Sequence, residues 1–113
     1  MALLSKHPQL AEAVRRIVAV LDPDRILLFG SQARGDPRSE SDYDLLVVKD
    51  TRERILALER KTYRALVGIP APVDILIETP GQLERLKDAP HLAFRSALMQ
   101  GVVIYERLDH RTT

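Results

Sequence analysis

Residues 29–48, FGSQARGDPRSESDYDLLVV, contain the pattern that decides how this 113-residue chain folds. An apolar, strand-like run ends just before Gly30, a polar loop follows, and Asp42 and Asp44 open a second apolar run over residues 45–48. Side chains two residues apart on a strand point to the same face, so these two carboxylates should lie close together. Keeping both ionised is costly, and a hard divalent cation such as Mg²⁺ removes that cost. The pattern therefore predicts a metal site at the start of a strand.

The turn before the loop has a signature of its own. Gly30 and Ser31 offer backbone N–H groups and a hydroxyl, which are donors that bind phosphate. A phosphate-binding turn, ten residues ahead of a metal-binding pair, indicates nucleotide chemistry. An isolated Gly-Ser or Asp-x-Asp also occurs in plain turns and at solvated strand ends, so the interpretation depends on the composite spacing.

The rest of the chain alternates between helical and strand-like patterns, which predicts an α/β fold around one sheet. We expect helices over residues 8–21, from about 50 to 67, and over 79–86, further helical turns over 91–99, and strands over 25–29, 43–48, 73–78 and 102–105. Asp50 with Glu53, and Thr79 with Gln82, have the spacing of capping boxes. Gly68 suits the end of the second helix. The pattern alone leaves the strand directions open.

Composition narrows the class of protein. We expect one domain over residues 1–113, with flexible ends at residues 1–9 and 107–113. No apolar run approaches the roughly 20 residues of a membrane helix, and no export signal is visible, so a cytoplasmic protein without membrane contact is expected. Zero cysteines exclude disulfides and thiolate metal sites. A net charge of +1 gives no general attraction to nucleic acid, so no direct nucleic-acid partner is expected.

The spacing also resembles the signature of a known family. Gly30-Ser31, Ala33-Arg34-Gly35, Ser41-Asp42-Tyr43-Asp44 and the aliphatic residues 45–48 are similar to the pattern of the minimal nucleotidyltransferases, or MNT proteins. These share the polymerase β palm-like nucleotidyltransferase fold, and the resemblance covers about residues 10–106. It implies a mixed four-stranded sheet with flanking helices, in which the first two strands are antiparallel. It also implies a third carboxylate on a later strand, where Asp74 stands.

The resemblance implies a chemistry for these residues. Asp42, Asp44 and Asp74 would be catalytic carboxylates and the ligands of two Mg²⁺ ions about 3.5–4 Å apart. A nucleoside triphosphate, expected to be ATP, would lose pyrophosphate while an acceptor hydroxyl receives the nucleoside monophosphate. Gly30 and Ser31 would bind the phosphates of the nucleotide.

Several residues have two possible interpretations, one functional and one structural. Arg34 could neutralise triphosphate oxygens or form a surface salt bridge. Asp74 could be a solvated residue on an edge strand, but its segment, with Val73 and Ile75 beside it, looks central, where an unpaired carboxylate is expensive. The basic residues of the segment 60–64 suit the solvated side of a helix or an acidic partner. The tyrosines are expected to pack rather than to stack on bases: Tyr43, Tyr63 and Tyr105.

Finally, the resemblance implies a partner. MNT proteins act with small, all-helical HEPN proteins in toxin–antitoxin pairs, and some transfer AMP to a tyrosine of the HEPN toxin. Because 113 residues leave no room for a separate acceptor domain, we expect a HEPN-family toxin to supply the acceptor, with this chain as antitoxin. Two alternatives stay open, namely an antitoxin that neutralises its partner by binding alone, and a transferase for a small molecule such as an aminoglycoside.

Overall fold

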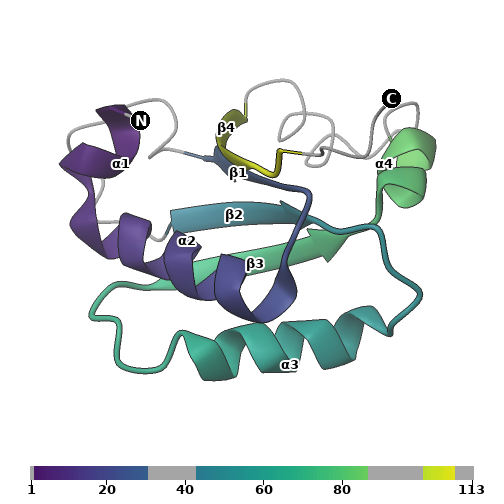
Figure 1. The fold of residues 1–113 in the computed structure, drawn as a ribbon, viewed down its shortest axis with the longest axis horizontal. Coiled ribbons are helices and arrows are strands. Elements are labelled where there is room, and N and C mark those ends of the chain that lie inside the picture. Colours follow the sequence, from purple (N-terminus) through teal and green to yellow (C-terminus); the bar gives the residue numbers. More distant parts are fainter. Residues whose placement is uncertain (1, 31–42, 87–100, 109–113) are drawn as a thin grey trace.

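The computed structural model describes residues 2–30, 43–86 and 101–108, whose arrangement is shown in Figure 1. The elements are α1 (Ala2–Lys6), α2 (Pro8–Leu21), β1 (Arg25–Phe29), β2 (Tyr43–Val48), α3 (Ile55–Ala65), β3 (Val73–Glu78), α4 (Pro80–Leu86) and β4 (Val102–Glu106). Within these residues, the strands form one sheet in the order β3-β2-β1-β4. β1 is antiparallel to β2 and β4, whereas β2 and β3 are parallel. The expected α/β fold, with a mixed sheet and antiparallel first strands, is confirmed.

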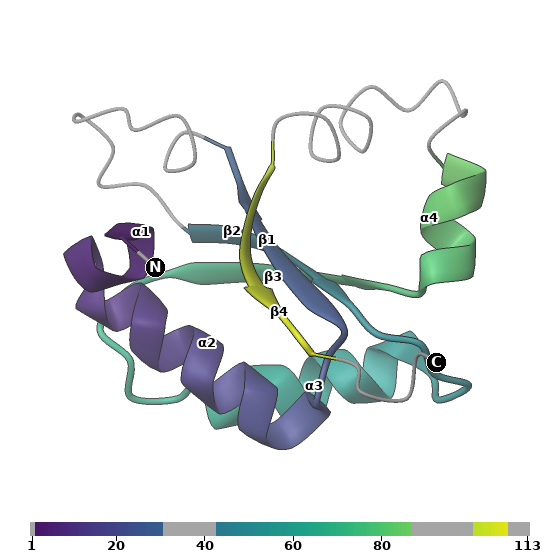
Figure 2. The ribbon, with the colours of Figure 1, turned by 45° about the horizontal axis from the view of Figure 1, so that its top comes forward.

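The main hydrophobic core lies on one face of the sheet. Leu45 and Val47 of β2, and Ile75 and Ile77 of β3, alternate onto this face, which α2 and α3 cover (Figures 1 and 2). α2 packs through a stripe of buried residues with helical spacing: Leu10, Ala13, Val14, Ile17 and Leu21. Each large apolar side chain buried here contributes roughly 1.5–3 kcal/mol relative to exposure. The helical layer therefore holds the sheet from one side.

A smaller apolar cluster occupies the opposite face. Leu27 of β1 and Leu46 and Val48 of β2 pack there with Leu83 of α4. Figure 2 shows α4 on this side of the sheet, away from α2 and α3. Gln82 N–H donates to Thr79 Oγ1 over 3.2 Å, so the hydroxyl half of the predicted capping box at the start of α4 is confirmed. The short helix α4 thus covers the part of this second face that is formed by Leu27, Leu46 and Val48.

The start of α3 is set by a contact that the local sequence does not show, whereas its end is not. The predicted capping box of Asp50 and Glu53 is wrong, because α3 begins at Ile55 without a side-chain cap. The Asp50 N–H instead donates to Asp24 Oδ2 over 2.7 Å, which keeps Asp50 in the loop beside β1. The end of α3 agrees with expectation: Gly68 follows it with a φ of +94°, a left-handed conformation that suits glycine.

The N-terminal segment contains a helix that the pattern does not predict. α1 precedes α2, and Leu4 packs against the main core. The His7 N–H donates to the Leu4 carbonyl over 3.1 Å at the junction of the two helices. The predicted turns over residues 91–99 and the tail over 109–113 lie outside the described residues. Within the described ranges, no helix is long and apolar enough to cross a membrane.

Candidate active site

Asp44 of β2 and Asp74 of β3 lie side by side. They are direct partners in the parallel pairing of the two strands, and each is the second residue of its strand. Neighbouring strands are about 4.8 Å apart, and paired residues point to the same face. That face is the one opposite α2 and α3, because the residues flanking these aspartates turn toward the main core. Strand pairing therefore brings two of the three predicted carboxylates together.

The residues on either side of Asp44 explain its orientation. Tyr43 and Leu45 are both buried in the main core, so the alternation of the strand turns Asp44 the other way. The Tyr43 hydroxyl lies 3.1 Å from His7 Nδ1, and the two rings meet edge to face. The prediction that Tyr43 is a packing residue is confirmed, since only 9% of it is exposed. Core packing at Tyr43 thus fixes the start of β2 and, with it, the direction of the Asp44 side chain.

The exposure of Asp74 corrects one expectation. Among the described strands β3 lies at an edge of the sheet, and the Asp74 side chain is exposed while Asp44 is half-buried. The interpretation of the Asp74 segment as central is therefore wrong, because the apolar residues Val73 and Ile75 face the helices on one side only. The cost of burial gives no reason to assign Asp74 a function. Its pairing with Asp44 is the reason that remains.

Gly30 meets Asp44 from the neighbouring strand. Phe29, the last residue of β1, pairs with Asp44, and Gly30 follows it with a φ of +80°. A Cβ atom built on Gly30 would lie 2.5 Å from Asp44 Oδ2, a distance that real Cβ contacts do not reach. Only glycine satisfies both the backbone angle and the space that the carboxylate takes. The spacing of the motif predicts a turn at Gly30, but its contact with Asp44 emerges only from strand pairing.

Three predicted site residues lie outside the described residues: Ser31, Arg34 and Asp42. Ser31 directly follows Gly30 in the chain, and Asp42 directly precedes β2. Because β1 and β2 are antiparallel and β2 and β3 are parallel, the end of β1 and the starts of the other two strands share one end of the sheet. The nucleotide-binding and metal-binding roles of these three residues stay predictions.

The donor chemistry of the described pair fits a hard divalent cation. Two carboxylates on adjacent strands offer only oxygen ligands, which Mg²⁺ prefers over nitrogen or sulfur. In the part of the chain that the structure describes, no group of three or more His, Cys, Asp or Glu side chains is placed to hold a metal. Asp44 and Asp74 could hold one with Asp42, which strand alternation would turn to the same face if β2 extended back to it.

Tyr63 has a role that the sequence pattern does not show. Its ring was expected to pack, but 44% of the residue is exposed. Its hydroxyl accepts a hydrogen bond of 3.0 Å from the Ile75 N–H, on the residue after Asp74. Edge strands leave every second N–H without a strand partner, and Tyr63 satisfies one of them from α3. No local signal could reveal this contact, because it depends on how α3 lies along β3.

The chain matches the family model described as "Polymerase beta, Nucleotidyltransferase" over residues 12–110. No curated protein gives a significant match. A Sulfolobus solfataricus protein described as a candidate nucleotidyltransferase has a similar structure, with a TM-score of 0.60 and 23% identity over 88% of this chain and 79% of its own. A chain from a toxin–antitoxin structure with AMP-PNP is also similar, with a TM-score of 0.51 and 23% identity over 84% of this chain and 72% of its own. At this identity, the two likenesses establish the fold.

Proposed function

Because the chain belongs to the polymerase β-type nucleotidyltransferase family, as a minimal member of it, we propose that it transfers AMP from ATP to a hydroxyl of a protein partner. The observation that carries this proposal is the pairing of Asp44 with Asp74 on one face of the sheet, with Gly30 closed against the Asp44 carboxylate. Paired carboxylates beside a glycine turn provide for a divalent cation and a phosphate in one place.

Each residue has a role in this proposal. Asp42, Asp44 and Asp74 would hold two Mg²⁺ ions, which when bound neutralise phosphate charge and make the acceptor hydroxyl more acidic. Gly30 and Ser31 donate hydrogen bonds to the triphosphate. The acceptor oxygen forms a bond to the α-phosphorus, and the bond from that phosphorus to the bridging oxygen breaks, releasing pyrophosphate. In this proposal Asp74, which is exposed at the edge of the sheet, would take the hydroxyl proton.

Arg34 is assigned to the triphosphate on weaker grounds. It stands in the segment between the glycine turn and β2, and its guanidinium could pair with phosphate oxygens that the acidic residues repel. This assignment comes from the motif alone. The effect of substituting Arg34 on ATP binding should therefore be compared with the effect of substituting Ser31 in the same segment.

The partner is assigned by analogy. One structural neighbour is a toxin–antitoxin complex with AMP-PNP, an ATP analogue, which supports ATP as the nucleotide and a toxin as the partner. We propose a HEPN-family toxin, with this chain acting as its antitoxin. We propose the cytoplasm as its compartment, because ATP is available there. A net charge of +1 supports a protein acceptor over direct nucleic-acid binding.

Mass spectrometry of the partner tests the proposal. The partner, incubated with this protein, Mg²⁺ and ATP, should gain the mass of one AMP per modified hydroxyl. Asp44→Asn should abolish the gain, whereas Asp50→Asn, which makes the same change at an exposed loop carboxylate, should retain it. If the partner is neutralised equally by wild type and Asp44→Asn in cells, neutralisation occurs by binding and the transfer proposal is wrong.

A further inference from the structure

The outer side of α3 has exposed apolar side chains. Leu56 is 57% exposed, Tyr63 44%, and Val67, in the turn just after the helix, 74%. Positions separated by seven and four residues fall on one side of a helix. These residues line a shallow hollow together with the charged side chains between them: Glu59, Arg60 and Arg64. The hollow runs along the whole length of α3.

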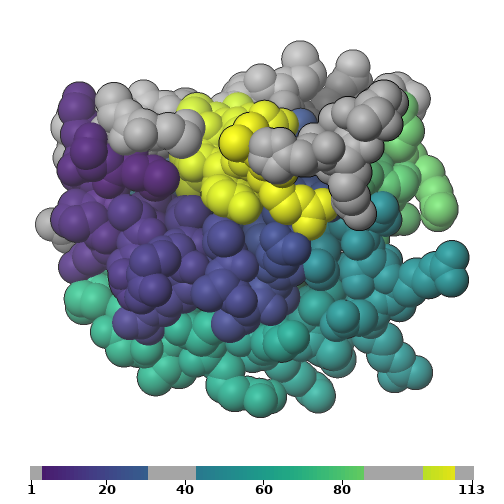
Figure 3. All heavy atoms as spheres, in the orientation of Figure 1, coloured from purple at the N-terminus to yellow at the C-terminus, as the bar shows by residue number. Residues whose placement is uncertain are grey.

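This apolar stripe is not the one that holds α3 to the protein. Leu58, Thr62 and Leu66 are buried and face the sheet, so α3 already has a core-facing side. A helix in a monomer needs only one apolar side, and apolar residues gathered on a second side mark a surface that another molecule covers. The space-filling view shows the side chains of the α3 segment, in teal, projecting from the lower margin of the molecule (Figure 3).

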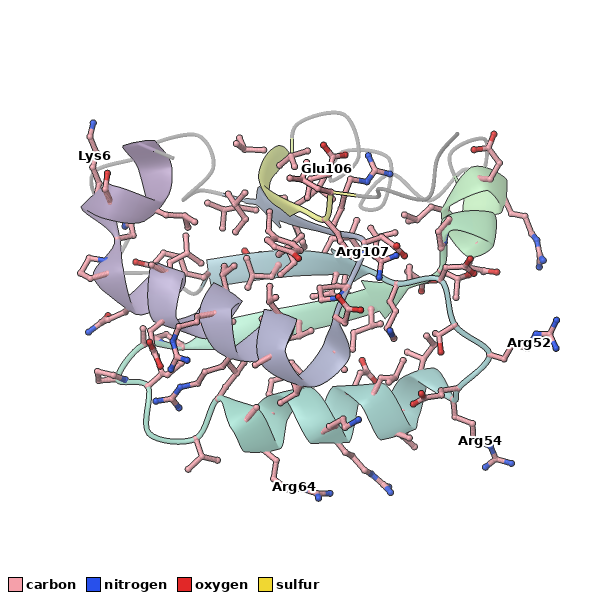
Figure 4. All side chains as sticks on the ribbon, viewed as in Figure 1. Lys6, Arg52, Arg54, Arg64, Glu106 and Arg107 are labelled. Carbon is pink, nitrogen blue, oxygen red and sulfur yellow. The ribbon has the colours of Figure 1, made fainter. Side chains whose placement is uncertain are left out.

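The charge around this surface is net positive. Residues 52–67 contain five basic and two acidic residues, a net charge of +3, whereas the whole chain carries +1. The rest of the chain is therefore net negative, at −2. Figure 4 shows Arg64 extending outward from α3, and Arg52 and Arg54 extending outward from the loop that precedes it. A surface that combines an apolar stripe with flanking arginines is complementary to an acidic, amphipathic partner.

The surface borders the candidate active site through one contact. Tyr63 belongs to the stripe, and its hydroxyl accepts the Ile75 N–H at the edge of β3. Ile75 follows Asp74, which points to the other face of the sheet. A partner lying on α3 would therefore border the edge strand β3 at Ile75, one residue beyond Asp74.

We propose that a protein partner docks on α3 through an acidic amphipathic helix. Its apolar side chains would cover Leu56, Tyr63 and Val67, and its carboxylates would pair with Arg60 and Arg64. The spacing of the stripe favours a helix, because helices pack through residues that recur at three and four positions. This inference rests on the proposed function in one respect, since it takes the partner to be the protein acceptor of the AMP group.

Calorimetry tests the docking surface, with the purified product of the neighbouring gene as the candidate partner. The double variant Arg60→Glu/Arg64→Glu should weaken binding at least tenfold, and added salt should weaken the wild-type complex. Leu56→Ser with Val67→Ser should also weaken it at least tenfold, and both residues are exposed enough for the fold to persist. Lys6→Glu with Arg85→Glu reverses two exposed charges on other helices and should leave the dissociation constant within twofold.

The outcomes separate this inference from the transfer proposal. If the α3 variants bind the partner like wild type, or if wild type does not bind it, the docking inference is wrong. If binding depends on α3 but no AMP is transferred, the docking inference is supported and the transfer proposal is wrong. The α3 variants should bind Mg-ATP normally, because the carboxylates lie on the other face. Sedimentation should show the isolated protein as a monomer, and a dimer dispersed by the arginine reversal would identify a second copy as the occupant instead.

Discussion

Arg107, one residue beyond β4, closes onto Asp24 at the start of β1. Its Nη2 donates to Asp24 Oδ1 over 2.7 Å, and its backbone N–H donates to the Asp24 carbonyl over 2.9 Å. The other carboxylate oxygen of Asp24 accepts the Asp50 N–H, so one side chain joins the ends of β4 and β2 to the start of β1. Asp24 is thus the point at which three segments far apart in the sequence meet.

Loss of the Asp24 carboxylate should destabilise the protein substantially. Asp24→Ala should lower the free energy of unfolding by about 2–3 kcal/mol, because charged acceptors of two hydrogen bonds are removed at a partly buried site. Arg107→Lys should retain only part of the wild-type interaction with Asp24, since an ammonium group cannot make the same paired contacts.

The control for these variants is Asp22→Asn. Asp22 is 70% exposed and contacts the same arginine, so its loss should cost no more than about 0.5 kcal/mol. Urea unfolding of all three variants checks this, and equal losses for Asp24→Ala and Asp22→Asn would contradict it.

Gly68 and Gly81 form a graded series with Gly30 and serve as its controls. Gly81→Ala in α4 should raise stability by about 0.5–1 kcal/mol, because nothing lies within 4 Å of the added Cβ. Gly68→Ala also meets open space, but its φ of +94° should cost about 1 kcal/mol. Gly30→Ala has the same conformational cost and also a clash with Asp44 Oδ2. It should be the most destabilising of the three by thermal melting.

Gly30→Ala should also differ from the others in activity. The added methyl group must displace the Asp44 carboxylate, so AMP transfer should fall at least about 100-fold, or about 2.7 kcal/mol of activation free energy. Gly68→Ala, with its similar backbone strain, should keep its activity at temperatures where it is folded. Normal transfer by folded Gly30→Ala would show that the position of Asp44 does not depend on this glycine.

Asp74 is tested by nucleotide-dependent stabilisation. Mg-ATP at about 100 times its dissociation constant should stabilise the wild-type protein by about 2.7 kcal/mol. Asp44→Asn and Asp74→Asn should each remove most of this gain, and neither should greatly change the stability of the protein alone. Scanning calorimetry with ATP, with and without Mg²⁺, gives the comparison. A full Mg-ATP shift in Asp74→Asn would identify Asp74 as a solvated edge residue and leave Asp42 with Asp44 as the metal ligands.

We expect the carboxyl group of Glu12 to make the free energy of unfolding depend on pH in the acid range. Hydrogen bonds from Arg15 and Arg16 lower the pKa of its carboxyl from 4.5 to about 2. A carboxyl whose pKa is lowered by folding contributes stability above its unfolded pKa, and that contribution is lost as the pH falls from 4.5 toward 2. Arg16 also donates to the carbonyls of Ala65 and Val67 at the end of α3, so the pair links α2 to α3.

The measurement is the urea midpoint between pH 6 and pH 2. Wild type should lose more stability over the lower part of this range than Glu12→Gln, which cannot ionise at this position. Glu53→Gln removes an exposed carboxylate elsewhere and should follow the wild-type curve. Parallel curves for wild type and Glu12→Gln would show that this carboxyl has the same pKa in the folded and unfolded states.

Local periodicity was sufficient to predict most elements. Alternation along β3 depends only on residues within the strand, so the strand positions and the turn of Asp74 away from the apolar face of β3 followed from the pattern. The stripe on α2, from Leu10 to Leu21, was predicted for the same reason. Strand direction required the family resemblance, because a run of apolar residues pairs equally well in either sense.

What the sequence by itself determined is therefore the positions of the strands and of α2 and α4, and that carboxylates stand at the starts of two strands. The tertiary structure alone decided that β3 lies at the edge of the described sheet, that Gly30 contacts the Asp44 carboxylate, and that Asp24 holds Asp50 in a loop where a helix start was expected. The physical reason is the distance along the chain over which each interaction acts. Side-chain alternation and helix periodicity act between residues a few positions apart, whereas these contacts join residues 14 to 30 positions apart, and their geometry exists only once the sheet has formed.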